Sequence, residues 1–398
     1  MIGRRGAGAL LLIVLIAVNL RPAITGVGPL LTEIQDDFRL SGAAAGALTT
    51  LPLVFFGAYG LLAPFLPRAP RSEALLVAAM ALLAAGILLR LLDAPFWLFA
   101  GSLVAGAAIS VGNIAVPAII KRDHPESITT VTAVYTVAVT AGASVTSAVV
   151  VPIEDITGSS WRLPLGLLAI PAAVAALCWL PRALRGGTPP PGRRVAGAVW
   201  RSGLAWHVTL FMGVQSMLAY VVFGWLPTLC QDRGMDDATS GYVLGVSALL
   251  QAVGALSVPA LERRVRDQRP LVIASVVLTM VGFAGVTWAP LGSIWIWTVV
   301  LGFGQGLGFA VALAFIGLRA HDADVAAQLS GMSQGVGYVI AALGPLAVGA
   351  LYDATGGWTV PTIAMLLLSA ALAIPGMAAG QNRTVAVPAP QEPAKNTP

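Results

Sequence analysis

The chain has 398 residues, of which 57% are hydrophobic and only 10% are charged. Soluble proteins carry about a quarter charged residues, so this chain has too few charges to cover the surfaces of soluble domains of its length. Its composition excludes a soluble enzyme, a DNA-binding protein and a secreted disulfide scaffold. It predicts a protein that lies in a membrane.

Apolar segments long enough to span a membrane recur along the whole chain. A spanning helix needs about 20 mostly apolar residues, and twelve such segments follow one another without strand-like alternation. They are residues 7–31, 42–65, 74–92, 95–119, 128–152, 162–180, 203–228, 239–260, 270–289, 293–317, 326–350 and 358–379. The expected fold class is an all-α membrane protein with twelve transmembrane helices in two pseudo-symmetric six-helix bundles.

The basic residues predict the orientation of these spans. Of the 23 Lys and Arg residues, eighteen fall on one membrane face and four on the other, and one, Arg21, belongs to neither because it lies deep inside the first span. Because Lys and Arg gather on the cytoplasmic side, we expect a multi-pass protein of the plasma (inner) membrane with both termini in the cytoplasm. Topology then explains the net charge of +5, and nucleic acid is not an expected partner.

Two polar segments divide the chain into parts. Residues 184–202, with Pro189–Pro191 among arginines, predict a cytoplasmic linker between an N-terminal bundle, 1–183, and a C-terminal bundle, 203–380. The Pro-rich residues 381–398 predict a disordered cytoplasmic tail.

Two short motifs recur at corresponding loops of the two halves. Pro-x-Leu-x-Arg ends at Arg68 and again at Arg263, while Arg-x-His begins at Arg122 and again at Arg319. Their common order favours a duplication of six helices about an axis along the membrane normal, with a cavity between the halves. We expect the loop residues to gate the cytoplasmic side of that cavity: Arg68, Arg122, His124, Arg263, Arg319 and His321.

Chemistry-bearing groups are missing from the middle of the spans. None of the eighteen acidic residues falls at mid-membrane depth, and the sequence contains no HExxH motif and no Walker motif. Group transfer or hydrolysis needs paired acids, a metal or an activated nucleophile. We therefore expect no enzyme activity, no metal site and no cofactor.

Arg21 is the charged residue that this placement leaves inside the membrane. It lies at least about ten residues from either end of the first span, or about 15 Å along a helix. A buried Arg costs at least about 2.5–3.5 kcal/mol and persists where it faces a cavity or a bundle interior. We expect it to bind an anion or an electron-rich solute through its planar guanidinium. The alternative is that it satisfies backbone carbonyls freed by Pro22.

Other polar side chains inside the spans are candidate substrate contacts. Some form pairs on one helix face, and for each of them a hydrogen bond between helices is the alternative. The candidates are Asn19, Asn113, Gln215, Tyr220, Gln251, Gln305, Gln334 and Tyr338. His207, near the cytoplasmic end of the seventh span, is the candidate for proton coupling because histidine titrates near neutrality; the alternative is a hydrated interfacial histidine.

Four segments resemble the cyanate and nitroimidazole porter family of the major facilitator superfamily. They are Asn19-Leu-Arg-Pro-Ala-Ile-Thr-Gly-Val-Gly-Pro-Leu-Leu31, Val116-Pro-Ala-Ile-Ile-Lys-Arg122, Trp225-Leu-Pro227 and Gln334-Gly-Val-Gly337. The first is the most specific. The resemblance implies a rocker-switch transporter with its substrate site between the halves, and it carries over Asn19 and Arg21 as the leading site residues.

Three functions stay open at this point. A buried arginine without carboxylates favours secondary active transport of a small solute, a small (organic) anion or an azole-like compound, by a monomer with or without a co-transported proton or ion. The alternative is an antiporter for efflux of drugs or toxic compounds, but the fifth span lacks the Gly-Pro motif and the acid usual in such antiporters. A non-transporting receptor or channel is disfavoured by the repeat of six helices.

Overall fold

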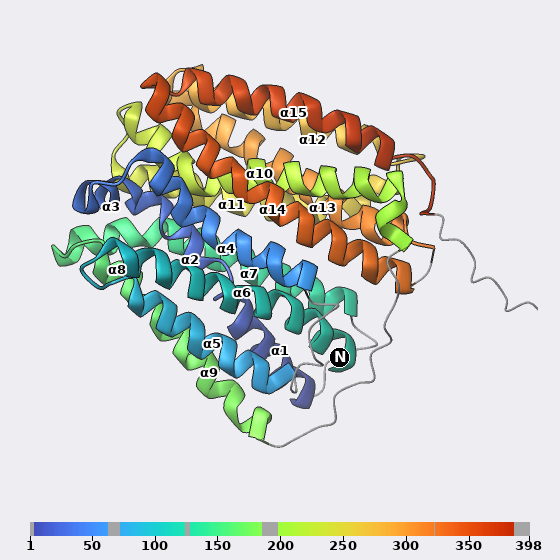
Figure 1. Cartoon of the computed structure of the whole chain (residues 1–398), viewed down its shortest axis with the longest axis horizontal. Coiled ribbons are helices and arrows are strands. Elements are labelled where there is room, and N and C mark those ends of the chain that lie inside the picture. The colour runs from blue at the N-terminus through green and yellow to red at the C-terminus, as the bar shows by residue number, and fades with distance from the viewer. Residues whose placement is uncertain (1–3, 63–71, 124–127, 185–197, 322, 386–398) are drawn as a thin grey trace, which may run out of the picture.

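The computed structural model describes residues 4–62, 72–123, 128–184, 198–321 and 323–385. These parts of the chain are helical and contain no strand. Figure 1 shows two bundles side by side, one from each half of the sequence. Both ends of the described chain lie at the end of the molecule where α9 stops, which we call the linker end; the opposite end, which carries α3 and α8, we call the α3 end (Figure 1).

The N-terminal half contains six membrane-crossing units, two of which are interrupted. Its elements are α1 (Arg4–Ala17), α2 (Pro22–Thr25), η1 (Gly28–Leu30), α3 (Leu31–Phe38), α4 (Gly42–Leu62), α5 (Ser72–Leu89), α6 (Pro95–Asp123), α7 (Ile128–Thr157), α8 (Arg162–Leu167) and α9 (Ala169–Leu184). The units α1–α3 and α8–α9 each form one crossing.

The C-terminal half repeats this plan with longer continuous helices. Its elements are η2 (Ala198–Arg201), α10 (Gly203–Asp232), α11 (Asp237–Glu262), α12 (Arg269–Trp288), η3 (Leu291–Ser293), α13 (Ile294–Leu318), α14 (Ala323–Thr355) and α15 (Thr359–Ala379).

The predicted spans and the observed helices agree within a few residues at most ends. Within the described chain, ten segments are long and apolar enough to cross a membrane, and Glu73–Leu89 of α5 is a shorter apolar helix. The helix α4 supplies the remaining crossing. The largest difference is in the first unit, where the helical segment runs to Phe38 in three separate pieces.

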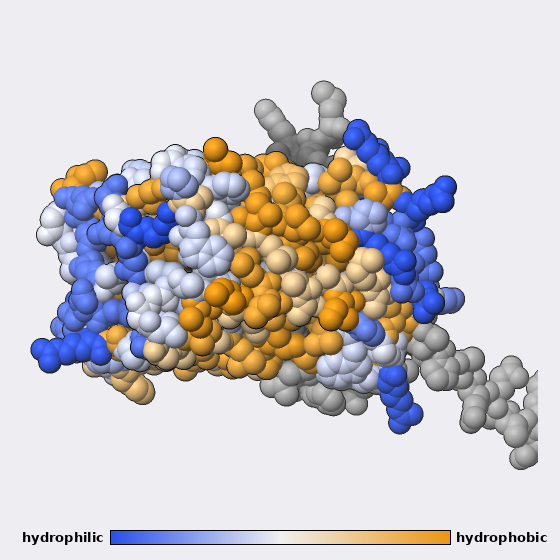
Figure 2. All heavy atoms as spheres, turned by 90° about the horizontal axis from the view of Figure 1, so that it is seen from above, coloured by the Kyte–Doolittle hydropathy of each residue, from blue (hydrophilic) through white to orange (hydrophobic). Residues whose placement is uncertain are grey.

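An apolar belt surrounds the molecule because the helices expose large aliphatic side chains to lipid. Leu177 is 66% exposed and Leu367 is 67% exposed. Figure 2 shows the hydrophobic residues as a broad central band with hydrophilic residues at both ends. In hydrocarbon the backbone polar groups must be satisfied internally, which helices do within one segment.

The two halves meet mainly where α4 packs along α14 and α7 packs along α11. Glycines permit close approach of the backbones. A Cβ at Gly46 would lie 2.4 Å from the carbonyl oxygen of Pro345, and one at Gly241 would lie 2.5 Å from that of Ser147.

Hydrogen bonds also join the halves at the α3 end. The carboxylate of Asp353 accepts bonds from the backbone N–H groups of Gly42, at 3.0 Å, and Ala43, at 3.1 Å. The Gln231 side chain accepts from the Thr32 hydroxyl at 3.0 Å and donates to the Pro29 carbonyl at 3.3 Å. The α3 end is therefore closed between the halves.

Candidate functional site

The first crossing is broken in the middle, and the break presents Arg21. Pro22 has no N–H, so the carbonyl of Val18 loses its helical partner. Asn19 and Leu20 bond to carbonyls three residues back, at 2.9 and 3.1 Å. A Cβ at Gly142 of α7 would lie 2.3 Å from the Val18 carbonyl oxygen, so only glycine permits this approach.

Arg21 lies between the two halves, directly before α2. Its Nη1 donates to the hydroxyl of Tyr220 on α10 at 3.2 Å. Its Cζ lies 5.6 Å from the centroid of the Tyr220 ring and 5.7 Å from that of Phe223. Among the described residues no carboxylate pairs with Arg21. The guanidinium is thus held by neutral aromatic partners.

Aromatic rings from both halves form a cluster next to this guanidinium, which we call the aromatic cage. Tyr220 and Tyr338 meet edge to face with centroids 6.4 Å apart, and Tyr338 meets Phe56 of α4 in the same way at 5.2 Å. Tyr220 also contacts Phe223 at 5.7 Å. Edge-to-face packing of rings is favourable in itself, so the cage is held in shape across the interface.

A third tyrosine extends the site toward α6 and α7. Tyr135 and Tyr338 lie in the neighbourhood of Arg21 but do not hydrogen-bond to it as Tyr220 does. The hydroxyl of Tyr135 donates to the side-chain oxygen of Asn113 at 3.3 Å. Three of the six tyrosines of the chain therefore lie near Arg21, and the candidate Asn113 is bonded to one of them.

Comparison with known families decides the class of this site. The family model of the Major Facilitator Superfamily matches residues 11–342. The chain belongs to the major facilitator superfamily. It is therefore a secondary transporter of a small-molecule substrate rather than an enzyme, and it crosses the membrane many times.

Relatives of this transporter are named for several small substrates. It is 39% identical to the 2-nitroimidazole transporter of Escherichia coli (strain K12) over 376 residues, which are 94% of this chain and 95% of that protein. It is 30% identical to the cyanate transport protein CynX of the same strain, over 88% of this chain and 91% of that protein. A putative anionic 4-hydroxy-benzoate permease of Thauera aromatica is 43% identical over 25% of this chain and 61% of that protein.

Solved structures confirm the fold of the transporter. It superposes on the nucleoside transporter NupG with a TM-score of 0.73 at 14% identity, covering 94% of this chain and 98% of that one. A bacterial homologue of the human lysosomal transporter Spinster, in an inward-facing and occupied conformation, gives a TM-score of 0.71 at 15% identity, with 94% and 96% covered. The prediction of a twelve-helix major facilitator fold is confirmed.

Two other candidate site residues, Asn19 and Gln334, form hydrogen bonds within their own halves rather than with Arg21. The amide of Asn19 donates to the carbonyls of Leu15, at 2.7 Å, and Pro171, at 3.3 Å, and so ties the end of α1 to α9. The amide of Gln334 donates to the Ser330 hydroxyl on its own helix at 2.8 Å.

Three glutamines of the C-terminal half bond to one another and to the backbone. Gln215 donates to the backbone carbonyl of Gln305 at 2.5 Å, and Gln305 donates to that of Leu218 at 3.2 Å. Gln251 donates to the Gln305 side chain at 3.4 Å. Gln305 is 0% exposed and Gln215 is 2% exposed, so these amides link α10, α11 and α13 inside one half.

The predicted gating residues are in different surroundings. Arg68 and His124 lie outside the described residues, as does the side chain of Arg122. Arg263 follows α11 and is exposed, and His321 is exposed as well. His207 keeps its Nδ1 2.7 Å from the carbonyl of Gly203 on its own helix.

Arg319 is buried within the C-terminal half, with an exposed fraction of 3%. Its Nε donates to the Ala379 carbonyl at 2.6 Å, and its guanidinium also contacts the side chain of Gln268. Its own carbonyl accepts from the N–H of Val385 at 2.8 Å. These bonds attach the start of the C-terminal segment, residues 381–385, to the bundle.

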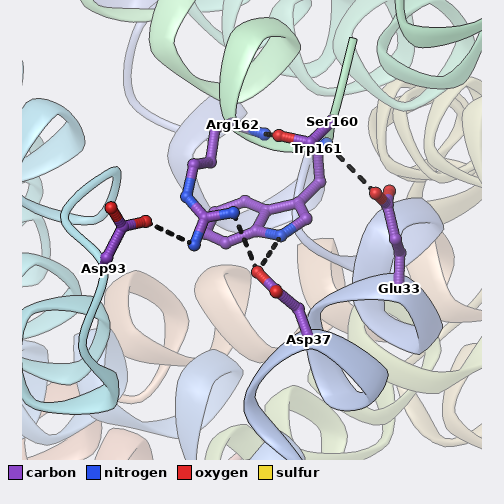
Figure 3. A network of polar contacts seen from close by, with 6 residues as sticks. All are labelled: Glu33, Asp37, Asp93, Ser160, Trp161 and Arg162. Carbon is purple, nitrogen blue, oxygen red and sulfur yellow. Dashed lines mark hydrogen bonds and ion pairs between the residues drawn. The ribbon is translucent and has the colours of Figure 1, made fainter. Parts of the chain in front are cut away.

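A polar network closes the α3 end of the N-terminal half (Figure 3). Arg162 pairs with Asp37 at 2.8 Å and with Asp93 at 3.0 Å. The indole of Trp161 donates to Asp37 at 3.0 Å, and its backbone N–H donates to Glu33 at 3.4 Å. The network links α3, α8 and the α5–α6 connection. Because its carboxylates are satisfied within one half, it serves structure rather than substrate binding.

The sequence did not reveal every residue around Arg21. Phe56, Tyr135 and Phe223 complete the cage but carry no motif. A usable signal was present for Tyr135, because a tyrosine hydroxyl within an apolar span needs a partner. The sequence assigned Arg90 to a membrane face, but its side chain is buried, with an exposed fraction of 2%.

Proposed function

We propose that this transporter moves a small planar organic anion or an azole-like compound, with Arg21 as its charged contact. The observation that carries the proposal is a guanidinium of the N-terminal half that contacts two aromatic rings of the C-terminal half, without a paired carboxylate among the described residues. A planar fork of N–H donors matches a carboxylate or nitro group in two hydrogen bonds. The rings of Tyr220 and Tyr338 supply faces on which a planar solute stacks.

The arrangement also supports alternating access. Arg21 and Phe56 belong to the N-terminal half, whereas Tyr220, Phe223 and Tyr338 belong to the C-terminal half. A solute bound among them contacts both halves, so its affinity depends on how the halves are disposed. In this proposal the α3 end faces outward and the linker end faces the cytoplasm of a plasma (inner) membrane, as the excess of Lys and Arg predicts.

The names of the relatives agree with this substrate class. A nitroimidazole, a hydroxybenzoate and cyanate are small and carry oxygen or nitrogen atoms that accept hydrogen bonds, and two of the three are planar rings. The aromatic cage favours the ring compounds over cyanate, because a linear three-atom anion offers little area for stacking.

Coupling and oligomeric state complete the proposal. We propose a monomer whose transport is coupled to a proton or another ion, with His207 as the titratable candidate near a span end. Uptake measured with and without an imposed pH gradient tests the coupling, and His207→Gln tests the residue. A gradient response that persists unchanged in His207→Gln removes it from the mechanism.

Reconstituted protein tests the role of Arg21. We expect 2-nitroimidazole, 4-hydroxybenzoate, nitrate and cyanate to differ in the thermal shift they give the wild-type protein, with the planar rings giving the larger shifts. Arg21→Ala is expected to abolish both shift and uptake in proteoliposomes. Arg21→Lys is expected to restore only part, because lysine keeps the charge but loses the fork. Unchanged uptake by a folded Arg21→Ala protein refutes the proposal.

A further inference from the structure

A second arginine is buried next to the broken first crossing. Arg90 directly follows α5 and reaches α2, where its Nη1 donates to the carbonyl oxygen of Ala23 at 2.5 Å. With 2% of its surface exposed, its charge is withdrawn from both water and lipid. Among the described residues, no Asp or Glu forms an ion pair with Arg90, so this arginine does not serve to neutralise an acid.

The carbonyl that Arg90 contacts is one that the helix break leaves free. In an uninterrupted helix the N–H of Val27 would bond to the carbonyl of Ala23. Here that N–H bonds to Ile24 instead, at 3.3 Å. An unsatisfied carbonyl inside a membrane protein is costly, and the guanidinium of Arg90 supplies the missing donor.

The same turn begins at Arg21. The carbonyl of Arg21 accepts bonds from the N–H groups of Ile24, at 2.9 Å, and Thr25, at 3.0 Å. Ala23 lies inside this hydrogen-bonded turn, two residues from Arg21. A shift of the Ala23 carbonyl therefore turns the backbone from which the Arg21 side chain projects.

The stem of Arg90 is confined, which makes it a rigid support. A Cβ at Gly101 of α6 would lie 2.8 Å from the Cγ of Arg90 and 2.9 Å from its backbone nitrogen. The side chain of Arg90 therefore has no room to adopt another rotamer on the side of α6. The Nε of Arg90 is buried without a hydrogen-bond partner, so the contact with Ala23 requires a polar N–H group to be desolvated, which costs free energy.

We propose that Arg90 is a positioning residue of the substrate site: it fixes the turn of α2 and so directs Arg21 into the aromatic cage. This inference rests on the proposed function, in which Arg21 binds the substrate. It adds a residue that touches no substrate but determines how well Arg21 binds the substrate.

One experiment reports on the position of residue 21 without any substrate. Cys178 and Cys230 are replaced by serine, Arg21→Cys is introduced, and the rate of alkylation by N-ethylmaleimide is measured in membranes. We expect Arg90→Met to change this rate several-fold, because the turn is no longer held. Arg39→Met, which removes one positive charge from an exposed residue at the α3 end, is the matched control and is expected to leave the rate unchanged.

A second experiment measures transport with Arg21 in place. Uptake of 2-nitroimidazole and of 4-hydroxybenzoate by Arg90→Met is expected to show a KM raised about tenfold, the effect of losing one charge-assisted hydrogen bond. The maximal rate per folded protein should change much less. Arg90→Lys keeps a charged donor and should give an intermediate KM. If Arg90→Met does not fold, the comparison of Arg90→Lys with the wild type replaces it.

The outcomes separate this inference from the proposed function. If the wild type shows uptake that depends on Arg21, while the Arg90 variants keep a normal KM and a normal alkylation rate, the positioning role is overturned alone. A lowered melting temperature with unchanged KM and alkylation also overturns it, since Arg90 is then merely structural. If wild type and Arg21→Ala take up both probes equally, the proposed function fails, and the alkylation rates still decide whether Arg90 sets the position of residue 21.

Discussion

Arg21 and Tyr220 form a hydrogen bond across the interface between the two halves, with Nη1 and Oη 3.2 Å apart. They lie on different bundles, so the bond exists only while the halves keep this relative position. The same residue pair therefore belongs to the candidate substrate site and to the contact between the halves that changes when they move relative to each other.

Tyr220→Phe removes the hydroxyl but keeps the ring that faces Arg21. We expect the KM for a planar anion to rise between twofold and tenfold, because a hydrogen bond contributes about 0.5–1.5 kcal/mol. Uptake kinetics in proteoliposomes measure the change. The ring contacts predict a larger loss for Tyr220→Ala, and equal effects of the two variants would show that the ring contributes nothing.

Gly142→Ala places a methyl group where the Val18 carbonyl oxygen lies 2.3 Å away. The backbone must move to relieve this overlap, and overpacking costs about 1–3 kcal/mol. We expect a lower melting temperature in detergent. Gly8→Ala is the matched control, since nothing lies within 4 Å of a Cβ there, and a melting temperature equal for both variants would contradict the close packing of α7 on the break.

Gln305→Leu distinguishes a substrate contact from a bond between helices. Its side chain partners Gln251 and the Leu218 carbonyl, and leaving buried partners unsatisfied costs about 1–3 kcal/mol. We expect reduced thermal stability with an unchanged KM for uptake. The opposite pattern, a raised KM at normal stability, would place Gln305 in the substrate path.

Gly28→Ala tests the closed α3 end. A Cβ at Gly28 would lie 2.5 Å from the carbonyl oxygen of Phe223 in the other half, so the halves can no longer close fully there. We expect the uptake rate to fall while each bundle stays folded. Labelling of a cysteine introduced at Thr32 from the α3 side should become faster, and normal labelling with normal uptake would contradict the prediction.

Asp236 gives the stability a pH dependence. It caps α11 by accepting from the N–H of Thr239 at 2.8 Å, and hydrogen bonds to Thr239 hold the pKa of Asp236 below its ordinary value. A depressed folded pKa adds stability above the unfolded pKa of about 3.9, and this stability is lost as the pH falls through the folded pKa.

The Asp236 variants turn this into a measurement. Asp236→Ala should lower stability near neutral pH by about 0.5–1 kcal/mol, the lower part of the range for helix caps, because the group is exposed. The difference from wild type should shrink in acid. Asp236→Asn keeps an acceptor that does not titrate, so its stability should vary less with pH in thermal melts.

The sequence predicted the helices well because each span is a long apolar run between polar connections. It also singled out Arg21, since a charged residue at that depth is costly unless it faces a cavity or a partner. Pro22 only suggested the break that presents Arg21. A proline indicates where a helix loses a hydrogen bond, but not which neighbouring segment packs against the freed carbonyl.

The rest of the site depends on contacts between distant segments. Phe56 and Tyr135 join the cage through packing across helices, which no spacing rule along one span encodes. Phe223 lies three residues after Tyr220 on α10, but that spacing alone does not show that both rings face Arg21. Arg90 was assigned to a membrane face because it lies near the end of an apolar run, yet its long side chain turns inward. A charge near a span end can face either water or the bundle, and tertiary packing decides which.

The contact between Gly28 and Phe223 has a consequence for how the α3 end opens. Pro227 lacks an N–H, so the carbonyl of Phe223 has no partner in its own helix, and in the closed state the Gly28 backbone covers it. When the halves part, that oxygen is uncovered, and water can donate a hydrogen bond to it. We therefore expect the opening of the α3 end to be accompanied by hydration of this backbone carbonyl.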